Sequence, residues 1–220
     1  MAFHTIDLST WNRAEHFLHY KNEVRCVICV THRITVTKLL PFLKQKNLRF
    51  YPVMIYLVTK ALHLQKEFRL GIDAEGNVGY WDSITPSYTV FHRETETFSC
   101  LWSPWDPEFS SFYLQVCSDI EKHRDFFHFS MPDLPPNHFD ISCLPWLSYD
   151  SFHINVEAGA YLAPIVTWGK YQEQQGEIQL PLSLQIHHAA ADGFHVSRFY
   201  QDLQHEISEF TGGESLSHTL

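Results

Sequence analysis

Two hydrophobic patterns meet near the C-terminal end of the chain, and together they predict a strand that leads directly into a helix. Apolar residues alternate with polar ones before position 188, so that Leu182, Leu184 and Ile186 share one face of a strand. Apolar residues then recur at helical spacing, namely Val196, Phe199, Leu203 and Ile207. The patterns predict a strand over residues 178–188 and a closing helix over residues 192–209.

The same two periodicities recur along the rest of the chain. Helices are predicted over residues 8–20, 38–46, 49–64 and 106–123, and the third of them is apolar nearly all round, as a buried helix is. Strands are predicted over residues 24–37, 70–72, 78–81, 87–92, 95–102, 138–144, 152–156 and 165–172. Strands with interspersed helices predict an α/β fold, a two-layer sandwich of helices on a mixed or antiparallel sheet. The 220 residues fit one domain over residues 1–210, with residues 211–220 as a flexible tail.

Composition narrows the class of protein. Hydrophobic residues make up 45% of the chain, which is typical of a globular protein and not of a disordered one. Apolar residues nowhere form the run of about 18 that a membrane-spanning helix needs. A formal net charge of −9 disfavours nucleic acid and anionic membrane surfaces as partners. Because the first residues lack the basic and apolar regions of a secretory signal, we expect a cytoplasmic protein.

The five cysteines are expected to be reduced core residues, since their number is odd and their neighbours are apolar. Cys26 and Cys29 have the C-x-x-C spacing that some metal and redox sites use. They fall, however, within a predicted strand, where residues three apart point to opposite faces of the sheet. We therefore expect no shared metal or disulfide bond at this pair.

The densest group of chemically active side chains lies at the predicted join of strand and helix, and comprises His187, His188, Asp192 and His195. Neighbouring side chains on a strand point to opposite faces, so only one of the two adjacent histidines can face a given pocket. A histidine at a strand end, with an ordinary pKa near 6.5, can act as a general base. Two histidines and a carboxylate could also hold iron or zinc, but the alternation disfavours this reading, and no metal is expected.

Residues 185–199 read QIHHAAADGFHVSRF, and they resemble the C-terminal signature H-H-x-x-x-D-G-F-H-V of the chloramphenicol acetyltransferase family. Further segments resemble the same family in the same order, at residues 11–17 (WNRAEHF), 50–56 (FYPVMIY), 94–99 (ETETFS), 145–146, 151–152 and 163–171 (APIVTWGKY). The shorter motif H-H-x-x-x-D-G also occurs in dihydrolipoamide acyltransferase cores and in condensation domains of peptide synthetases, both of which have additional segments. The resemblance spans nearly the whole chain and implies a coenzyme A-dependent acyltransferase fold.

This resemblance implies a reaction and roles for named residues. An acetyl group would pass from acetyl-coenzyme A to the primary hydroxyl of chloramphenicol, by direct attack and without an acyl-enzyme. His188, the second histidine of the motif, would be the general base. Ser142 matches the serine whose hydroxyl bonds the oxyanion, and Thr167 matches a threonine that holds a water nearby. Loss of one oxyanion donor typically lowers turnover by about 100- to 1000-fold.

The resemblance also implies which residues support the site and line the drug pocket. Asp192 would pair with Arg13 and clamp the N-terminal helix to the active-site turn, although by spacing alone an ordinary surface salt bridge or a helix N-cap remains open. The positions that match the lining of the antibiotic pocket are Tyr20, Cys26, Phe98, Phe129, Ile154 and Val156. Without the resemblance, such aromatic residues and cysteines in apolar strands would be read as core residues. His19 and Cys100 depart from the residues usual in the family, which bears on substrate range.

Two function classes follow. The first is an antibiotic-inactivating acetyltransferase that is active as a homotrimer with its sites between subunits, as the resemblance implies. The second is a catalytically weak relative that binds acyl-coenzyme A or an aromatic ligand without turnover. A binding module has no need of a base beside an oxyanion donor, so the presence of both His188 and Ser142 favours the enzyme.

Overall fold

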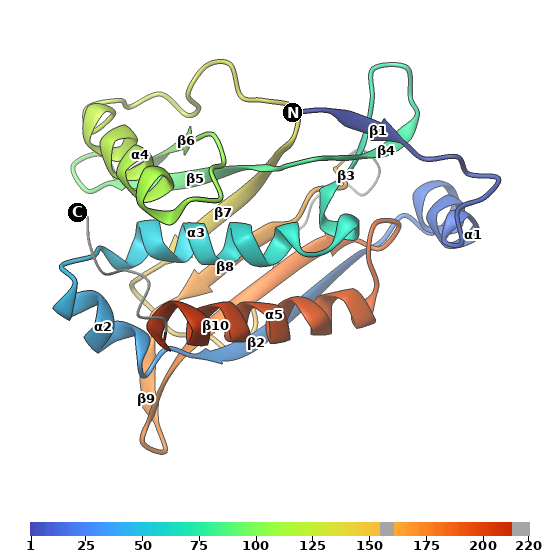
Figure 1. Ribbon diagram of the computed structural model, residues 1–220. Coiled ribbons are helices and arrows are strands. Elements are labelled where there is room, and N and C mark those ends of the chain that lie inside the picture. Colours follow the sequence, from blue (N-terminus) through green and yellow to red (C-terminus); the bar gives the residue numbers. More distant parts are fainter. Residues whose placement is uncertain (155–160, 213–220) are drawn as a thin grey trace.

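One mixed sheet forms the body of the computed structural model, which describes residues 1–154 and 161–212 (Figure 1). The strand order is β2-β10-β8-β7-β5-β6, and β9 also pairs with β10. The strands are β2 (Val27–Thr35), β5 (Thr85–His92), β6 (Thr97–Trp102), β7 (His138–Leu144), β8 (Ile165–Gly169), β9 (Gln172–Gln174) and β10 (Glu177–His187). Because β7 runs parallel to β5 and β8 while the other pairs are antiparallel, the sheet is mixed, as predicted.

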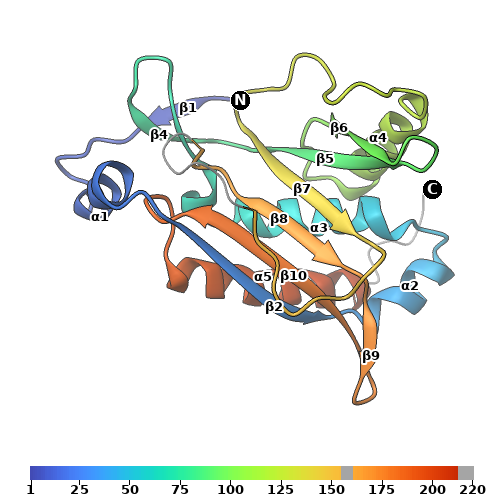
Figure 2. The same ribbon diagram turned by 180° about the vertical axis from the view of Figure 1, so that it is seen from behind.

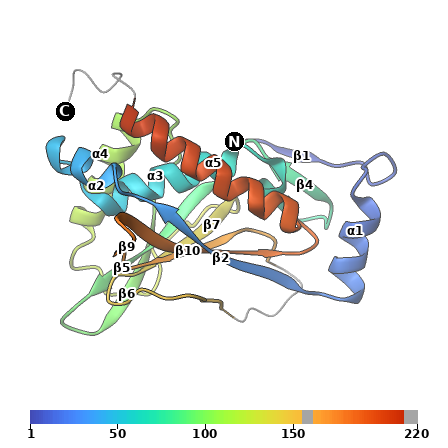
Figure 3. The same cartoon turned by 90° about the horizontal axis from the view of Figure 1, so that it is seen from below.

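Helices cover one face of this sheet (Figure 2). The other face, here called the open face, carries no helix in the described part of the chain, and residues 149–154 cross it with hydrogen bonds to β2, β8 and β10. The covering helices are α2 (Leu39–Gln45), α3 (Phe50–His63), α4 (Phe109–Lys122) and α5 (Gly193–Gly212). The central helix α3 is buried on nearly every side, which explains its almost continuous apolar sequence. Seen from below, α3 and α5 lie side by side above the strands (Figure 3). The predicted two-layer sandwich is confirmed.

A small second sheet and the N-terminal segment lie at one end of the molecule. Its strands are β1 (Phe3–Thr5), β3 (Leu70–Ile72) and β4 (Val78–Trp81), in the order β1-β4-β3. A 3₁₀-helix, η2 (Lys66–Arg69), joins α3 to β3. Sequence periodicity predicts β3 and β4 but not the three-residue β1, which is too short to show alternation.

The predicted helix over residues 8–20 is wrong in extent. The α-helix α1 covers only Ala14–Leu18, and it continues as a π-helix, η1, over His19–Glu23. The Asp7 carboxylate accepts hydrogen bonds from the backbone N–H and hydroxyl of Ser9 and so forms a turn where the helix was predicted to begin. Helical spacing of aromatic residues predicts a helix here but not this competing turn.

Three further boundaries differ from the prediction. Residues 152–154 form no strand, and residues 155 and 156 of the predicted strand lie outside the described part of the chain. The predicted strand over residues 165–172 divides into β8 and the short β9. Helix α5 continues to Gly212, so the first two residues of the predicted tail are helical.

Register places a row of hydroxyl side chains across the open face of the sheet. Thr31 pairs with Ser183, Ser183 with Thr167, and Thr167 with Ser142. The next strand continues the row, because Thr89 Oγ1 lies 3.4 Å from Ser142 Oγ. On β5, β7 and β8, the residue just before each of these hydroxyl residues is buried, namely Tyr88, Ile141 and Val166. On β10, the residue just after Ser183 is Leu184, which is buried as well. Alternation along each strand therefore separates an apolar core face from an open face with hydroxyls.

Candidate active site

The two adjacent histidines lie in different surroundings. His187 is the last residue of β10 and is only 1% exposed, and its Nδ1 accepts a hydrogen bond from Ala189 N–H at 3.1 Å. Burial, followed by the nearby positive charges of Lys21 and His188, lowers the pKa of His187. His188 is half-buried, and its backbone N–H donates to the Cys26 carbonyl at 2.9 Å. Of the two rings, that of His188 is the more accessible to a substrate.

A local irregularity of the backbone brings Tyr20 onto His188. In the π-helix η1, Val24 N–H donates to the His19 carbonyl and Arg25 N–H to the Tyr20 carbonyl, each five residues back. The Tyr20 ring lies flat on the His188 imidazole, with ring centroids 3.7 Å apart and planes 9° apart. Stacking fixes the plane of the imidazole, and so Tyr20 orients His188 directly. Cys26 contributes its backbone carbonyl to the same corner.

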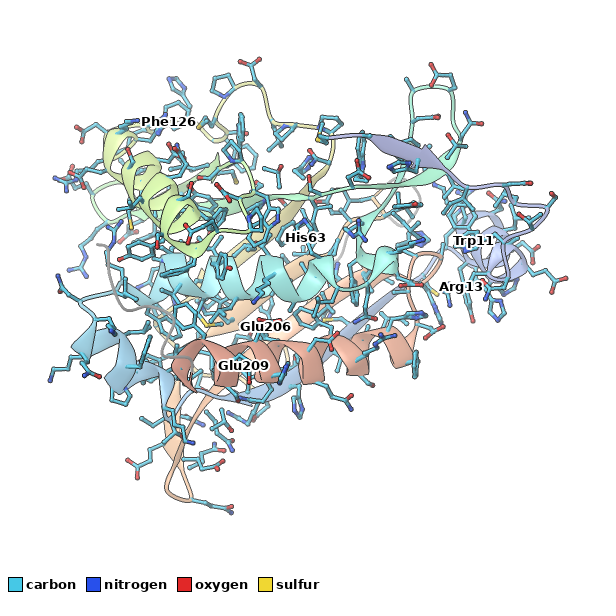
Figure 4. All side chains as sticks on the ribbon, in the orientation of Figure 1. Trp11, Arg13, His63, Phe126, Glu206 and Glu209 are labelled. Carbon is cyan, nitrogen blue, oxygen red and sulfur yellow. The ribbon has the colours of Figure 1, made fainter. Side chains whose placement is uncertain are left out.

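Asp192 is the centre of an ionic group next to this corner. Arg13 Nη1 donates to Asp192 Oδ2 at 2.7 Å, and His195 Nδ1 lies 2.9 Å from Asp192 Oδ1. The same Oδ1 accepts from Phe194 N–H at 3.0 Å at the start of α5. Figure 4 shows Arg13 near this end of α5, on the N-terminal segment. No hydrogen bond joins Asp192 to His188 in the described ranges, so the carboxylate supports the turn and not the imidazole directly.

The surroundings of Asp192 stabilise its charged form. Burial by itself raises the pKa of this carboxyl, but the hydrogen bond from Arg13 and the charges of His195 and Arg13 outweigh that effect. The pKa falls to about 2 as a result. The Arg13 side chain is 13% exposed and that of Asp192 is 33% exposed, so burial of the pair is incomplete. A charge-assisted hydrogen bond of this kind contributes about 1.5–3 kcal/mol to stability.

A second group of predicted site residues lies on the open face, around the hydroxyl row. Ser142 is half-buried and Thr167 is 2% exposed, and they are register partners on β7 and β8. The Tyr149 hydroxyl donates to the Thr167 carbonyl at 2.6 Å and lies 3.4 Å from Ser183 Oγ. The sequence analysis missed Thr89 and Tyr149. The alternation of β5 could have indicated Thr89, whereas nothing in the sequence brings Tyr149 to this row.

Aromatic residues border the second group. The rings of Phe98 and Phe129 are 5.9 Å apart, and Phe129 is 70% exposed. The Cys100 N–H donates to the Phe129 carbonyl at 2.7 Å, which holds this loop against β6. Ile154 is exposed, and its N–H donates to Gln185 Oε1 at 3.0 Å. Val156, the remaining predicted pocket residue, lies outside the described residues.

The two groups are far apart within one chain. From Ser183, which shares a row with Ser142, the strand β10 continues to its last residue, His187, and His188 follows directly, five residues beyond Ser183. At about 3.3 Å per residue along a strand and about 4.8 Å between strands, Ser142 and His188 are roughly 19 Å apart. That separation is much greater than the reach of one reacting centre, which requires a base and an oxyanion donor within about 3 Å of the reacting atoms.

No group of three histidine, cysteine or carboxylate side chains is arranged to hold a metal ion within residues 1–154 and 161–212. In the same ranges, no helix has both the length and the apolar character needed to cross a membrane. All five cysteines are free thiols.

Comparison with known proteins agrees with the resemblance seen in the sequence. A family model for chloramphenicol acetyltransferase matches residues 1–204. A chloramphenicol acetyltransferase of Clostridium perfringens is 44% identical over 213 residues, which cover 96% of this chain and 97% of that protein. Chloramphenicol acetyltransferase 2 of Escherichia coli is 41% identical over 208 residues, which cover 93% of this chain and 96% of that protein.

Solved structures show the same fold. A structure titled chloramphenicol acetyltransferase has a TM-score of 0.81 at 22% identity, and the match covers 94% of this chain and all of the other. A dihydrolipoamide acetyltransferase of Azotobacter vinelandii has a TM-score of 0.66 at 17% identity, covering 90% of this chain and 87% of the other. The coenzyme A-dependent acyltransferase fold is thereby confirmed. Because the family model matches most of the chain and the two relatives are more than 40% identical over nearly their full length, the chain belongs to the chloramphenicol acetyltransferase family.

Proposed function

We propose that the enzyme transfers an acetyl group from acetyl-coenzyme A to the primary (3-)hydroxyl of chloramphenicol and thereby inactivates the antibiotic. The family and the names of its relatives support both substrates. The observation that carries the proposal is His188, an accessible imidazole that stacks on Tyr20 at the end of a rigid strand. A neutral imidazole with a fixed ring plane is suited to accept a proton from an alcohol at neutral pH.

In the proposed reaction, His188 takes the proton of the primary hydroxyl while that oxygen attacks the thioester carbonyl. Nδ1 of His188 is buried, so Nε2 is the nitrogen that faces the hydroxyl. Ser142 donates a hydrogen bond through its hydroxyl to the carbonyl oxygen as that oxygen becomes negative, and Thr167 holds a water close to it. The carbon–sulfur bond of the thioester then breaks and coenzyme A leaves as a thiolate. His188 then returns the proton to the leaving thiolate. The chain forms no covalent bond to the acetyl group.

Arg13 and Asp192 support this site, and the aromatic residues form its walls. The Arg13–Asp192 hydrogen bond would hold the N-terminal segment against the turn that carries His188. Chloramphenicol would lie against Phe98, Phe129, Ile154 and Val156, with Tyr20 and Cys26 at the side of the base. Tyr20 would also have a second role, which is to orient the His188 imidazole on which its ring stacks.

We further infer that the active species is a homotrimer in which one subunit supplies His188 and its neighbour supplies Ser142. The separation of about 19 Å within one chain leaves the base without an oxyanion donor, and a second copy would supply it. Large apolar side chains are exposed on and beside the open face of the sheet, among them Phe91, Phe98, Phe129, Trp146 and Leu147. An apolar surface of this kind is typical of a subunit interface. We place the protein in the cytoplasm, where its thiols would stay reduced.

A direct assay tests the proposed function. Purified protein is incubated with acetyl-coenzyme A and chloramphenicol, and free thiol release is measured together with the mass of the drug. We expect one thiol released for each drug molecule that gains an acetyl group. Tight binding of chloramphenicol without any thiol release would instead indicate a binding protein that lacks turnover.

A further inference from the structure

Both ring nitrogens of His195 face carboxylates. Nδ1 lies 2.9 Å from Asp192 Oδ1, and Nε2 lies 3.5 Å from Glu67 Oε1. The His195 side chain is only 13% exposed and that of Glu67 is 26% exposed. An aromatic ring that only filled space would need no acidic partner on either edge. The Nε2–Glu67 contact links α5 to η2, and the Nδ1–Asp192 contact joins His195 to the turn that precedes α5.

This link extends the Arg13–Asp192 pair into a group of four residues from four separate segments. Arg13 precedes α1, Asp192 closes the turn after β10, His195 lies in the first turn of α5, and Glu67 lies in η2. Each oxygen of Asp192 has its own side-chain contact, since Oδ2 accepts from Arg13 at 2.7 Å and Oδ1 lies 2.9 Å from His195 Nδ1. With contacts on both oxygens, the Asp192 carboxylate cannot rotate without breaking one of them.

We propose that His195 is a positioning residue for acetyl transfer, because it fixes Asp192 and, through it, the turn that aims His188. This inference rests on the proposed role of His188 as the base. Within the turn, Ala190 N–H and Ala191 N–H donate to the His187 carbonyl at 2.9 and 3.3 Å, and at its near end His188 N–H donates to the Cys26 carbonyl at 2.9 Å. The far end of the turn is anchored through Asp192, so a shift of that carboxylate would displace the turn from the end opposite the Cys26 contact.

Matched variants of His195 test the link. In His195→Asn, the side-chain amide can donate to Asp192 from the place of Nδ1 but no longer reaches Glu67. His195→Ala removes both contacts. His205→Ala is the control, because His205 is an exposed histidine on the same helix that lines a groove beside β2, away from this group. A displacement of a catalytic group by about 1 Å can lower the rate by up to about a hundredfold.

We expect His195→Ala to lower kcat at least tenfold, while the KM for each substrate changes by less than about twofold. His195→Asn should recover most of that loss, and His205→Ala should behave like the unaltered protein. In an Asp192→Asn background, His195→Ala should cause no further loss of kcat, since it acts through the same carboxylate. Equal losses in both backgrounds, or a rise in KM alone, would show that His195 does not act through Asp192.

A measurement that needs no turnover separates this inference from the proposed function. The ¹⁵N resonances of the His188 ring are recorded for the three variants, with chloramphenicol absent. His195→Ala should shift or broaden these resonances, whereas His195→Asn and His205→Ala should leave them in place. Unchanged His188 resonances in His195→Ala overturn the inference. A shift in a protein that fails to acetylate chloramphenicol would refute the proposed function and leave the positioning role of His195 standing.

Discussion

His187 and His188 are neighbours in the sequence, yet the ring of His187 is buried and that of His188 is only half-buried. His187 is enclosed and takes a hydrogen bond from the turn that follows it, while His188 stacks on Tyr20. Strand alternation predicts that the two rings differ, but it does not say which of them is buried. The choice of His188 came from the family motif, and its accessible ring supports the proposed role.

The first prediction compares the two histidines. His188→Ala should abolish acetyl transfer to below a few per cent of the original kcat and leave chloramphenicol binding largely intact, because it removes the proton acceptor. His187→Ala should mainly lower the midpoint of thermal unfolding, since it removes a buried ring and its hydrogen bond to Ala189. Turnover and drug binding are measured for both variants. A greater rate loss at position 187 than at 188 would reverse the assignment.

The second prediction concerns metal ions. The proposed chemistry uses a proton acceptor and hydroxyl donors and assigns no step to a metal. Prolonged treatment with EDTA should therefore leave kcat unchanged, measured after the chelator has been removed. A loss of activity that added zinc or iron restores would show that the cluster of His187, His188 and Asp192 holds an ion.

At the scale of elements, the sequence predicted the parts with long, regular patterns. The strand β10 and helix α5, which flank the turn that begins with His188, followed from alternation and from helical spacing. The N-terminal segment did not, because a turn around Asp7 and a π-helix replace one continuous helix. The stacking of Tyr20 on His188 depends on that π-helix. Its i+5 hydrogen bonds change which way a side chain points, and periodicity arguments assume i+4 bonds.

The third prediction concerns the connection between α3 and β5. His63 Nδ1 donates to the Thr59 carbonyl at 2.7 Å, and Nε2 accepts from Ile84 N–H at 3.1 Å, so both nitrogens of this half-buried ring are bonded at the end of α3 (Figure 4). Burial is the main cause that lowers the pKa of His63 from 6.5 to about 4. Below pH 6.5, His63 binds a proton in the unfolded chain but not in the folded chain. The free energy of unfolding therefore falls as the pH falls from 6.5 toward 4.

Between pH 7.5 and 4.5, this single histidine should account for a loss of about 2–3 kcal/mol in the free energy of unfolding. Urea unfolding at fixed protein concentration measures it in the original protein and in His63→Gln. The variant should be less stable at pH 7.5 but should lose less stability on acidification. An equal loss in both proteins would assign the pH dependence to other groups, among them His187, whose pKa is also lowered.

At the scale of the whole molecule, the distance between the two groups of site residues was beyond the reach of sequence patterns. Ser142, Thr167 and His188 are predicted as site residues from their match to family positions, but a motif carries no information about whether its residues meet in the same chain. Strand order decides that question. β7 and β10 are separated by β8, and the register then places His188 five residues beyond the row that holds Ser142.

The fourth prediction tests whether the site forms between subunits. His188→Ala lacks the base, and Phe129→Trp is designed to block the drug pocket, so each should be inactive alone. Mixed trimers, formed by refolding the two together, should recover activity, because some interfaces combine an intact His188 with an intact pocket. Sedimentation establishes the assembly. An active species with the mass of one chain, or no recovery in proven mixed trimers, would show that each chain works alone.

Because the proposed base and the proposed oxyanion donor lie about 19 Å apart in one chain, the activity of mixtures of intact and altered chains should depend on which residues are altered. In a cyclic trimer, every chain would serve two sites at once, with His188 in one and Ser142 in the next. A chain altered only at His188 or only at Ser142 disables one site, so total activity should equal the fraction of unaltered chains. A chain altered at both residues disables two sites, so activity should equal the square of that fraction. Activity measured against the fraction of altered chains therefore shows to how many sites one chain contributes.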